Sequence, residues 1–91
     1  MKSAFYLFFS IVLSLGAHAQ SAGEWYRKAQ SAYEAEDFDL AIQCVDQAIS
    51  ISRKGDYFKL RGDAFHKQEE FGSALADYDF ASKMGCLSTD L

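Results

Sequence analysis

Apolar and small side chains recur between residues 38 and 52 with the period of an α-helix. They follow one another at intervals of three or one along Phe38, Ala41, Ile42, Val45, Ala48, Ile49 and Ser52. Polar residues fill most of the positions between them. This spacing predicts an amphipathic helix that buries one face.

The same order of bulky and small positions returns further along the chain, in a register that pairs Ala41 with Ala74. The other matched pairs in this repeat register are Trp25/Phe58, Ala29/Gly62, Ala32/Phe65, Phe38/Phe71, Ile42/Leu75 and Ala48/Ala81. Such self-similarity at a fixed period is typical of stacked supersecondary units that cannot bury their apolar faces alone. The doubled pattern predicts four helices, near residues 22–35, 38–53, 56–69 and 71–84.

Local signals mark where these helices begin and end. Ser21 and Glu24 have the spacing of a capping box, and Asp37 is a suitable N-cap for the second helix. The segment Arg53-Lys54-Gly55 is expected to close the second helix, and Gly85 the fourth.

The loops within each predicted hairpin are only a few residues long. Short loops place consecutive helices antiparallel. Ala29 and Gly62 should then meet Ala41 and Ala74 on the second helix of each pair, and their small side chains should let the backbones approach closely.

Both units resemble tetratricopeptide repeats. The pattern has an aromatic at repeat position 4, a small residue at 8, an aromatic near 11, and alanine at 20 and 27; it is carried here by Trp25, Ala29, Tyr33, Ala41 and Ala48, and then by Phe58, Gly62, Phe65, Ala74 and Ala81. Two features depart from the family. The usual closing proline is replaced by Arg53 and Cys86, and the period that separates Ala41 from Ala74 is one residue shorter than the family's.

The resemblance implies an all-α fold in which antiparallel helical hairpins stack as a short right-handed solenoid. Two repeats would occupy about residues 22–54 and 55–87, followed by a short C-terminal tail. Repeats of this family mostly hold protein partners.

The segment 1–19 has the composition of a secretory signal peptide. Lys2 is followed by an apolar run from Ala4 to Leu15 and by an Ala-x-Ala site that ends at Ala19. A membrane anchor is the alternative, but the apolar run is about 12 residues and a spanning helix needs roughly 20. The prediction is cleavage after Ala19, a secreted or periplasmic protein beginning at Gln20, and no stable membrane span thereafter.

The charge of the chain bears on its binding partners, and the positions of its cysteines bear on disulfide formation. The formal net charge is −4, and loss of Lys2 with the leader would make it more negative. Nucleic acids and anionic membranes attract basic patches, so neither is expected as a partner. Cys44 corresponds to Asp77, and Cys86 lies further along the chain, about 13 Å from it when measured along parallel helix axes. A disulfide within the chain is therefore not expected, while one between chains through Cys86 stays open.

No residue pattern indicates catalysis, a cofactor or a metal. His66 is the one histidine after the leader, and no Cys-x-x-Cys, His-Glu-x-x-His or glycine-rich phosphate loop occurs. The acidic pairs are expected at helix starts or on the outer face, where they would serve the helix dipole, and they are Glu36/Asp37, Glu69/Glu70 and Asp77/Asp79. The chain is predicted not to be an enzyme.

The family resemblance implies a binding surface on the concave face, formed by the first helix of each pair. It would present Tyr26, Arg27, Gln30, Tyr33, Lys59, Asp63, His66 and Lys67. The lysine and asparagine, four residues apart, with which some members grip a C-terminal carboxylate are absent at Tyr26/Gln30 and Lys59/Asp63. The alternative is that all eight are ordinary solvent-facing residues.

The sequence thus predicts an exported, non-enzymatic module that binds a peptide or protein partner. The alternative is a truncated piece or subunit of a larger solenoid that assembles, or self-associates, through an uncapped C-terminal face. That face would carry Leu75, Tyr78 and Phe80, although Ser82 stands where the first copy has Ile49.

Overall fold

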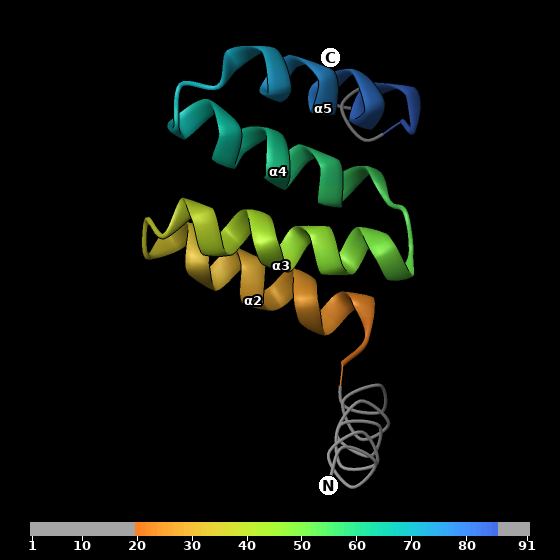
Figure 1. The fold of residues 1–91 in the computed structure, drawn as a ribbon. Coiled ribbons are helices and arrows are strands. Elements are labelled where there is room, and N and C mark those ends of the chain that lie inside the picture. The colour runs from red at the N-terminus through yellow and green to blue at the C-terminus, as the bar shows by residue number, and fades with distance from the viewer. Residues whose placement is uncertain (1–19, 86–91) are drawn as a thin grey trace, which may run out of the picture.

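The computed structural model describes residues 20–85, which form an all-α fold of packed helical hairpins. Helices α2 (Ala22–Glu34) and α3 (Phe38–Ile51) make the first hairpin, and α4 (Gly55–Lys67) and α5 (Phe71–Lys83) make the second. The hairpins join where α3 packs against α4, so the helices lie one above another in chain order (Figure 1). The predicted leader and Cys86 lie outside the described residues.

The two hairpins have nearly the same bounds when they are compared in the repeat register. Helices α2 and α4 coincide at both ends, and α3 and α5 coincide at their first residue. The predicted helix positions are therefore confirmed to within one or two residues.

Both predicted N-caps are confirmed. Ser21 Oγ accepts from the Glu24 amide at 3.2 Å, and the Ser21 amide donates to Glu24 Oε1 at 2.8 Å, which completes the capping box. Asp37 Oδ1 accepts from the Leu40 amide at 3.2 Å at the start of α3. These bonds satisfy amides that have no partner inside the helix.

The turn inside each hairpin is built on a glutamate in left-handed backbone conformation. Glu36 has φ 64° and Glu69 has φ 63°, and the two glutamates occupy the same place in the repeat register. The amide after each one closes the helix end, because Asp37 N donates to the Ala32 carbonyl at 2.9 Å and Glu70 N to that of Phe65 at 2.8 Å. This is a Schellman motif without glycine.

The expected role of Gly55 is wrong. Helix α3 ends at Ile51 with Ser52 as its C-cap, and Gly55 is the first residue of α4. Ser52 and Lys54 both have extended backbone, which leaves no helical turn for a glycine to close. Gly85 does follow the fourth helix as predicted, with φ 84°.

Small residues line the contacts between helices. Ala29, Ala41, Ala48, Ala64 and Ala81 are completely buried. The predicted close approach is present in the second hairpin, where a Cβ added to Gly62 would lie 3.3 Å from the Ala74 carbonyl oxygen.

Candidate protein-binding surfaces

The eight residues predicted to bind a partner are divided between α2 and α4. Those that are exposed are Arg27, Gln30, His66 and Lys67, and those that are half-buried are Tyr26, Tyr33, Lys59 and Asp63. We call the surface they occupy the α2/α4 face. The half-buried members decide its chemistry, because their positions are fixed by contacts.

Asp63 is the centre of a polar cluster on this face. Its Oδ1 accepts from the Tyr78 hydroxyl at 2.5 Å, and its Oδ2 lies 3.7 Å from Lys59 Nζ. Tyr33 of α2 also experiences the charge of Asp63: burial raises the pKa of Tyr33, the Asp63 carboxylate raises it further, and Lys59 partly offsets the rise. We call Tyr33, Lys59, Asp63 and Tyr78 the Asp63 cluster.

Tyr78 was not predicted to belong here. It comes from α5, and its ring passes over Gly62, where an added Cβ would lie 2.8 Å from Cε1. Burial, and then the hydrogen bond to Asp63, raise the pKa of Tyr78. A glycine at position 62 is thus what allows an α5 side chain to reach the α2/α4 face.

The other predicted residues lie to either side of the cluster. Tyr26 packs on Tyr57 with ring centroids 5.0 Å apart. The His66 and Phe71 rings pack edge to face, with their centroids 5.2 Å apart. Lys67 lines a cavity of about 340 Å³ together with Tyr33, Glu34, Glu36 and Phe38.

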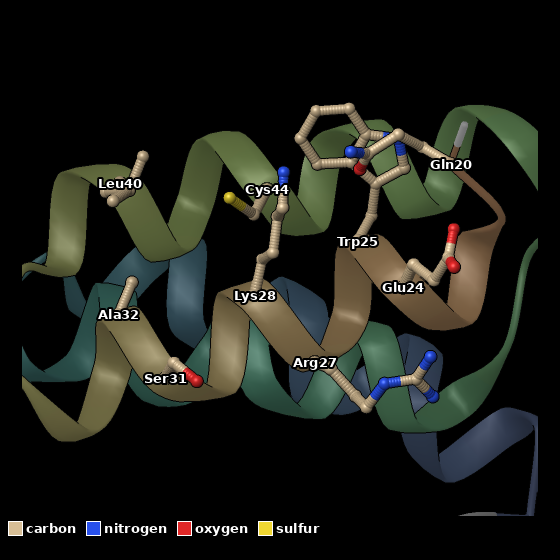
Figure 2. Close-up of a pocket in the computed structure, with 9 residues that line it drawn as sticks. All are labelled: Gln20, Glu24, Trp25, Arg27, Lys28, Ser31, Ala32, Leu40 and Cys44. Carbon is tan, nitrogen blue, oxygen red and sulfur yellow. The ribbon is translucent and has the colours of Figure 1, made fainter. Parts of the chain in front are cut away.

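A larger groove, of about 840 Å³, lies between α2 and α3 (Figure 2). Its lining is mixed and consists of Gln20, Glu24, Trp25, Arg27, Lys28, Ser31, Ala32, Leu40 and Cys44. Lys28 Nζ lies 4.9 Å from the centre of the Trp25 ring, a cation–π distance. Figure 2 shows Lys28 rising toward α3, whereas Arg27 leaves α2 in another direction.

The groove was not predicted from the sequence, because Trp25 occupies a position that the repeat pattern assigns to the core. The signal lay in the repeat register. Trp25 matches Phe58, which is 3% exposed, yet Trp25 itself is only half-buried. Phe58 contacts Phe80 and Arg53. The corresponding residues beside Trp25 are Gln47 and Gln20, so the Trp25 ring lies at an open surface.

The three residues of the predicted assembly face do not lie together. Leu75 is 71% exposed on the outer side of α5, but Tyr78 is turned to Asp63. Phe80 is 45% exposed and stacks on Phe58 at 5.2 Å, with the Arg53 guanidinium above both rings. Leu75 and Phe80 therefore occupy different faces of the helix.

Asp77 also differs from expectation, because it is buried instead of lying on the outer face. It is 4% exposed and receives two hydrogen bonds from Arg61, from Nε and from Nη2, each 2.8 Å long. Its role in the fold is to hold α4 against α5.

Within residues 20–85, no group of three or more histidine, cysteine or acidic side chains is placed to hold a metal ion. None of the four helices in that range is long and apolar enough to cross a membrane. Cys44 is a free, buried thiol.

No protein-family model, curated protein or solved structure matches this chain. The fold is established by its own helices and contacts, while membership of the tetratricopeptide family remains a prediction.

Proposed function

We propose that this chain is an exported, non-enzymatic interaction module of the tetratricopeptide type, which binds a peptide or a loop of a partner protein on the α2/α4 face. The observation that carries this proposal is the Asp63 cluster. Three helices contribute to it, and it combines two tyrosine rings with one cation and one anion.

These groups are suited to an extended peptide. A carboxylate accepts from backbone amides, a lysine donates to carbonyl oxygens, and tyrosine offers apolar area beside a hydroxyl. Tyrosine is enriched where protein interfaces are strongest. Because Asp63 and Tyr78 already hold one another, little side-chain freedom remains to be lost on binding.

Export is the second part of the proposal and has its own test. Intact-mass measurement on the chain recovered outside the cytoplasm should show a protein that begins at Gln20. Recovery of the uncut chain in the cytosol would contradict export without bearing on peptide binding.

The binding test uses a displayed library of random peptides presented to the immobilised chain. Selected peptides are then titrated against the wild type and two lysine variants. Lys59→Gln removes a cation from the Asp63 cluster, and Lys83→Gln is its matched control. Both lysines make an ion pair with an aspartate four residues away, at 3.7 Å in the half-buried Lys59–Asp63 pair and at 3.1 Å in the exposed Lys83–Asp79 pair.

Lys59→Gln should weaken binding about tenfold, which corresponds to roughly 1.4 kcal/mol. The control should bind like the wild type. Joint substitution of Tyr26, Tyr33 and Lys59 by alanine should weaken binding further while helicity persists. Full binding by that triple variant would move the site to another surface.

A further inference from the structure

The junction between the two hairpins shows what covers the first helix of a hairpin. Arg61 of α4 donates from Nη1 to Asp46 Oδ1 of α3 at 2.9 Å. Beside this ion pair, Ile42 of α3 packs against the cluster that contains Ala64. Nearer the C-terminal end of α3, Ile49 packs against the cluster that contains Leu60.

Helix α2 presents the corresponding positions to the open groove. In the repeat register Lys28 corresponds to Arg61, and Ser31 corresponds to Ala64. Lys28 and Ser31 are exposed, whereas Ala64 is completely buried. The groove of about 840 Å³ therefore marks where α2 lacks, within residues 20–85, the neighbour that α3 provides to α4.

Helix α5 presents the matching half of the same junction at the other end of the molecule. Leu75 corresponds to Ile42 and is 71% exposed. Asp79 corresponds to Asp46, and its side chain is 65% exposed. Leu75 and Asp79 are one helical turn apart, so they share a face.

We propose that copies of this chain associate head to tail, with α5 of one copy seated on α2 of the next copy, in the relation that α3 has to α4 within the chain. The occupant of the α2/α3 groove is thus a second copy. The junction would repeat the chain's own internal geometry and would pair Asp79 of one copy with Lys28 of the other.

The residues by which α5 and α2 differ from the internal α3/α4 junction are complementary to one another. The ion pair of the internal junction is kept with the same polarity, because an aspartate still lies on the second helix and a cation on the first. The apolar contact of Ile49 with the Leu60 cluster becomes Ser82 facing Arg27, so a polar residue meets a polar residue at that point. Leu75 takes the place of Ile42 and would face Ser31, at the end of the groove that Ala32 and Leu40 line.

The existing ion pair of Asp79 does not oppose this pairing. Asp79 has an ion pair with Lys83, but both side chains are mostly exposed, and such pairs contribute little stability. Because fewer apolar groups are buried than at the internal junction, the association should be weak and sensitive to salt. A heterologous junction that does not close produces an open series of oligomers instead of a single dimer.

The test is sedimentation velocity over a concentration series, on the chain recovered after expression of the complete sequence. The average mass of the wild type should rise continuously with concentration and fall when salt is added. A single monomeric mass at every concentration would overturn the proposal.

Two charge reversals then identify the surfaces. Lys28→Asp and Asp79→Lys should each leave a monomer, because like charges would meet at every junction. An equimolar mixture of the two variants should associate again, since each junction in an alternating series joins opposite charges. A chain that carries both reversals should associate like the wild type.

Lys28→Asp alone distinguishes the head-to-tail arrangement from a symmetric dimer. A symmetric contact between two α5 helices would be unaffected by Lys28→Asp, and that result would overturn the head-to-tail proposal. Lys83→Gln removes the existing ion-pair partner of Asp79 and should leave association intact or strengthen it; loss of association in this variant would contradict the pairing of Asp79 with Lys28. All variants alter exposed side chains, and circular dichroism should show an unchanged helix content.

Discussion

Arg61 and Asp77 join α4 to α5 through two parallel hydrogen bonds, each 2.8 Å long, from Nε to Oδ2 and from Nη2 to Oδ1. The aspartate is almost completely buried, at 4% exposure. The third contact of the guanidinium, from Nη1 to Asp46 of α3, is 2.9 Å long. One side chain thus ties three successive helices together, and the hydrogen bonds to Asp77 are the largest cause of the raised pKa of Arg61.

Arg61→Ala should destabilise the fold strongly. The substitution leaves the Asp77 carboxylate buried without its cation, which typically costs about 3 kcal/mol or more. Arg61→Lys should recover only part of the loss, because an ammonium group cannot reproduce the two-pronged contact. Thermal unfolding followed by circular dichroism measures both effects.

Asp46→Asn is the matched control, since it removes the more exposed partner of the same arginine. The Asp46 side chain is 52% exposed, against 5% for that of Asp77, so its loss should cost less than about 1 kcal/mol. Equal destabilisation by Asp46→Asn and Asp77→Asn would show that the buried pair has no special weight.

Gly62→Ala should also destabilise the protein, although alanine is the better helix former. A Cβ at this position would lie 2.8 Å and 2.9 Å from two ring carbons of Tyr78, which is closer than such atoms pack. Tyr78 cannot simply turn away without losing its bond to Asp63. The clash should outweigh a propensity gain of about 1 kcal/mol and give a net loss of roughly 1–2 kcal/mol.

Gly72→Ala provides the opposite expectation in the same hairpin. Nothing lies within 4 Å of a Cβ built on Gly72, so only the helix propensity changes and the melting temperature should rise. If both substitutions raise it, the close approach of Tyr78 is not a constraint on the fold.

The helices were predictable because local signals and the long-range pattern agreed. The helical period located the buried faces, and the caps at Ser21 and Asp37 located the starts. The turns were less visible, because Glu36 and Glu69 adopt a conformation that sequence patterns associate with glycine. The prediction that Gly55 follows the end of α3 was wrong for a related reason. A glycine also fits the start of a helix that follows an extended segment, and Gly55 is the first residue of α4.

The candidate site was predictable only in part. Positions on α2 and α4 follow from the helical period, so it could be predicted that Tyr33, Lys59 and Asp63 lie on the same face. The arrival of Tyr78 from α5 depends on how closely α4 and α5 approach at Gly62, which no pattern along the chain measures. For Asp77 the signal was present and overlooked: it matches Cys44, and that position is buried in both hairpins.

Ala41→Leu and Ala74→Leu should both destabilise by overpacking, by about 1–3 kcal/mol. Ala41 is completely buried and Ala74 is 2% exposed. Ala41→Leu should cost more, because α3 lies between two packed helices while α5 has one open side within residues 20–85. Ala76→Leu places the same enlargement at an exposed position of α5 and should leave the melting curve unchanged; a similar loss there would refute the packing explanation.

Tyr78 should make the stability of the fold fall at alkaline pH. Burial first, and then the hydrogen bond to Asp63, raise the pKa of Tyr78 in the folded protein, whereas an unfolded tyrosine ionises near its ordinary value of about 10. Above that value the unfolded chain releases the tyrosine proton while the folded chain retains it. The contribution of Tyr78 is therefore complete below pH about 10 and is lost as the pH rises toward the pKa of the folded state.

Tyr78→Phe should lower stability at neutral pH by about 1 kcal/mol, through loss of the bond to Asp63, and should flatten the alkaline decline. Urea unfolding at several pH values measures both effects, and tyrosinate absorbance should show one residue fewer that ionises late. A decline of the same slope in the wild type and in Tyr78→Phe would show that Tyr78 does not hold its proton through the Asp63 cluster.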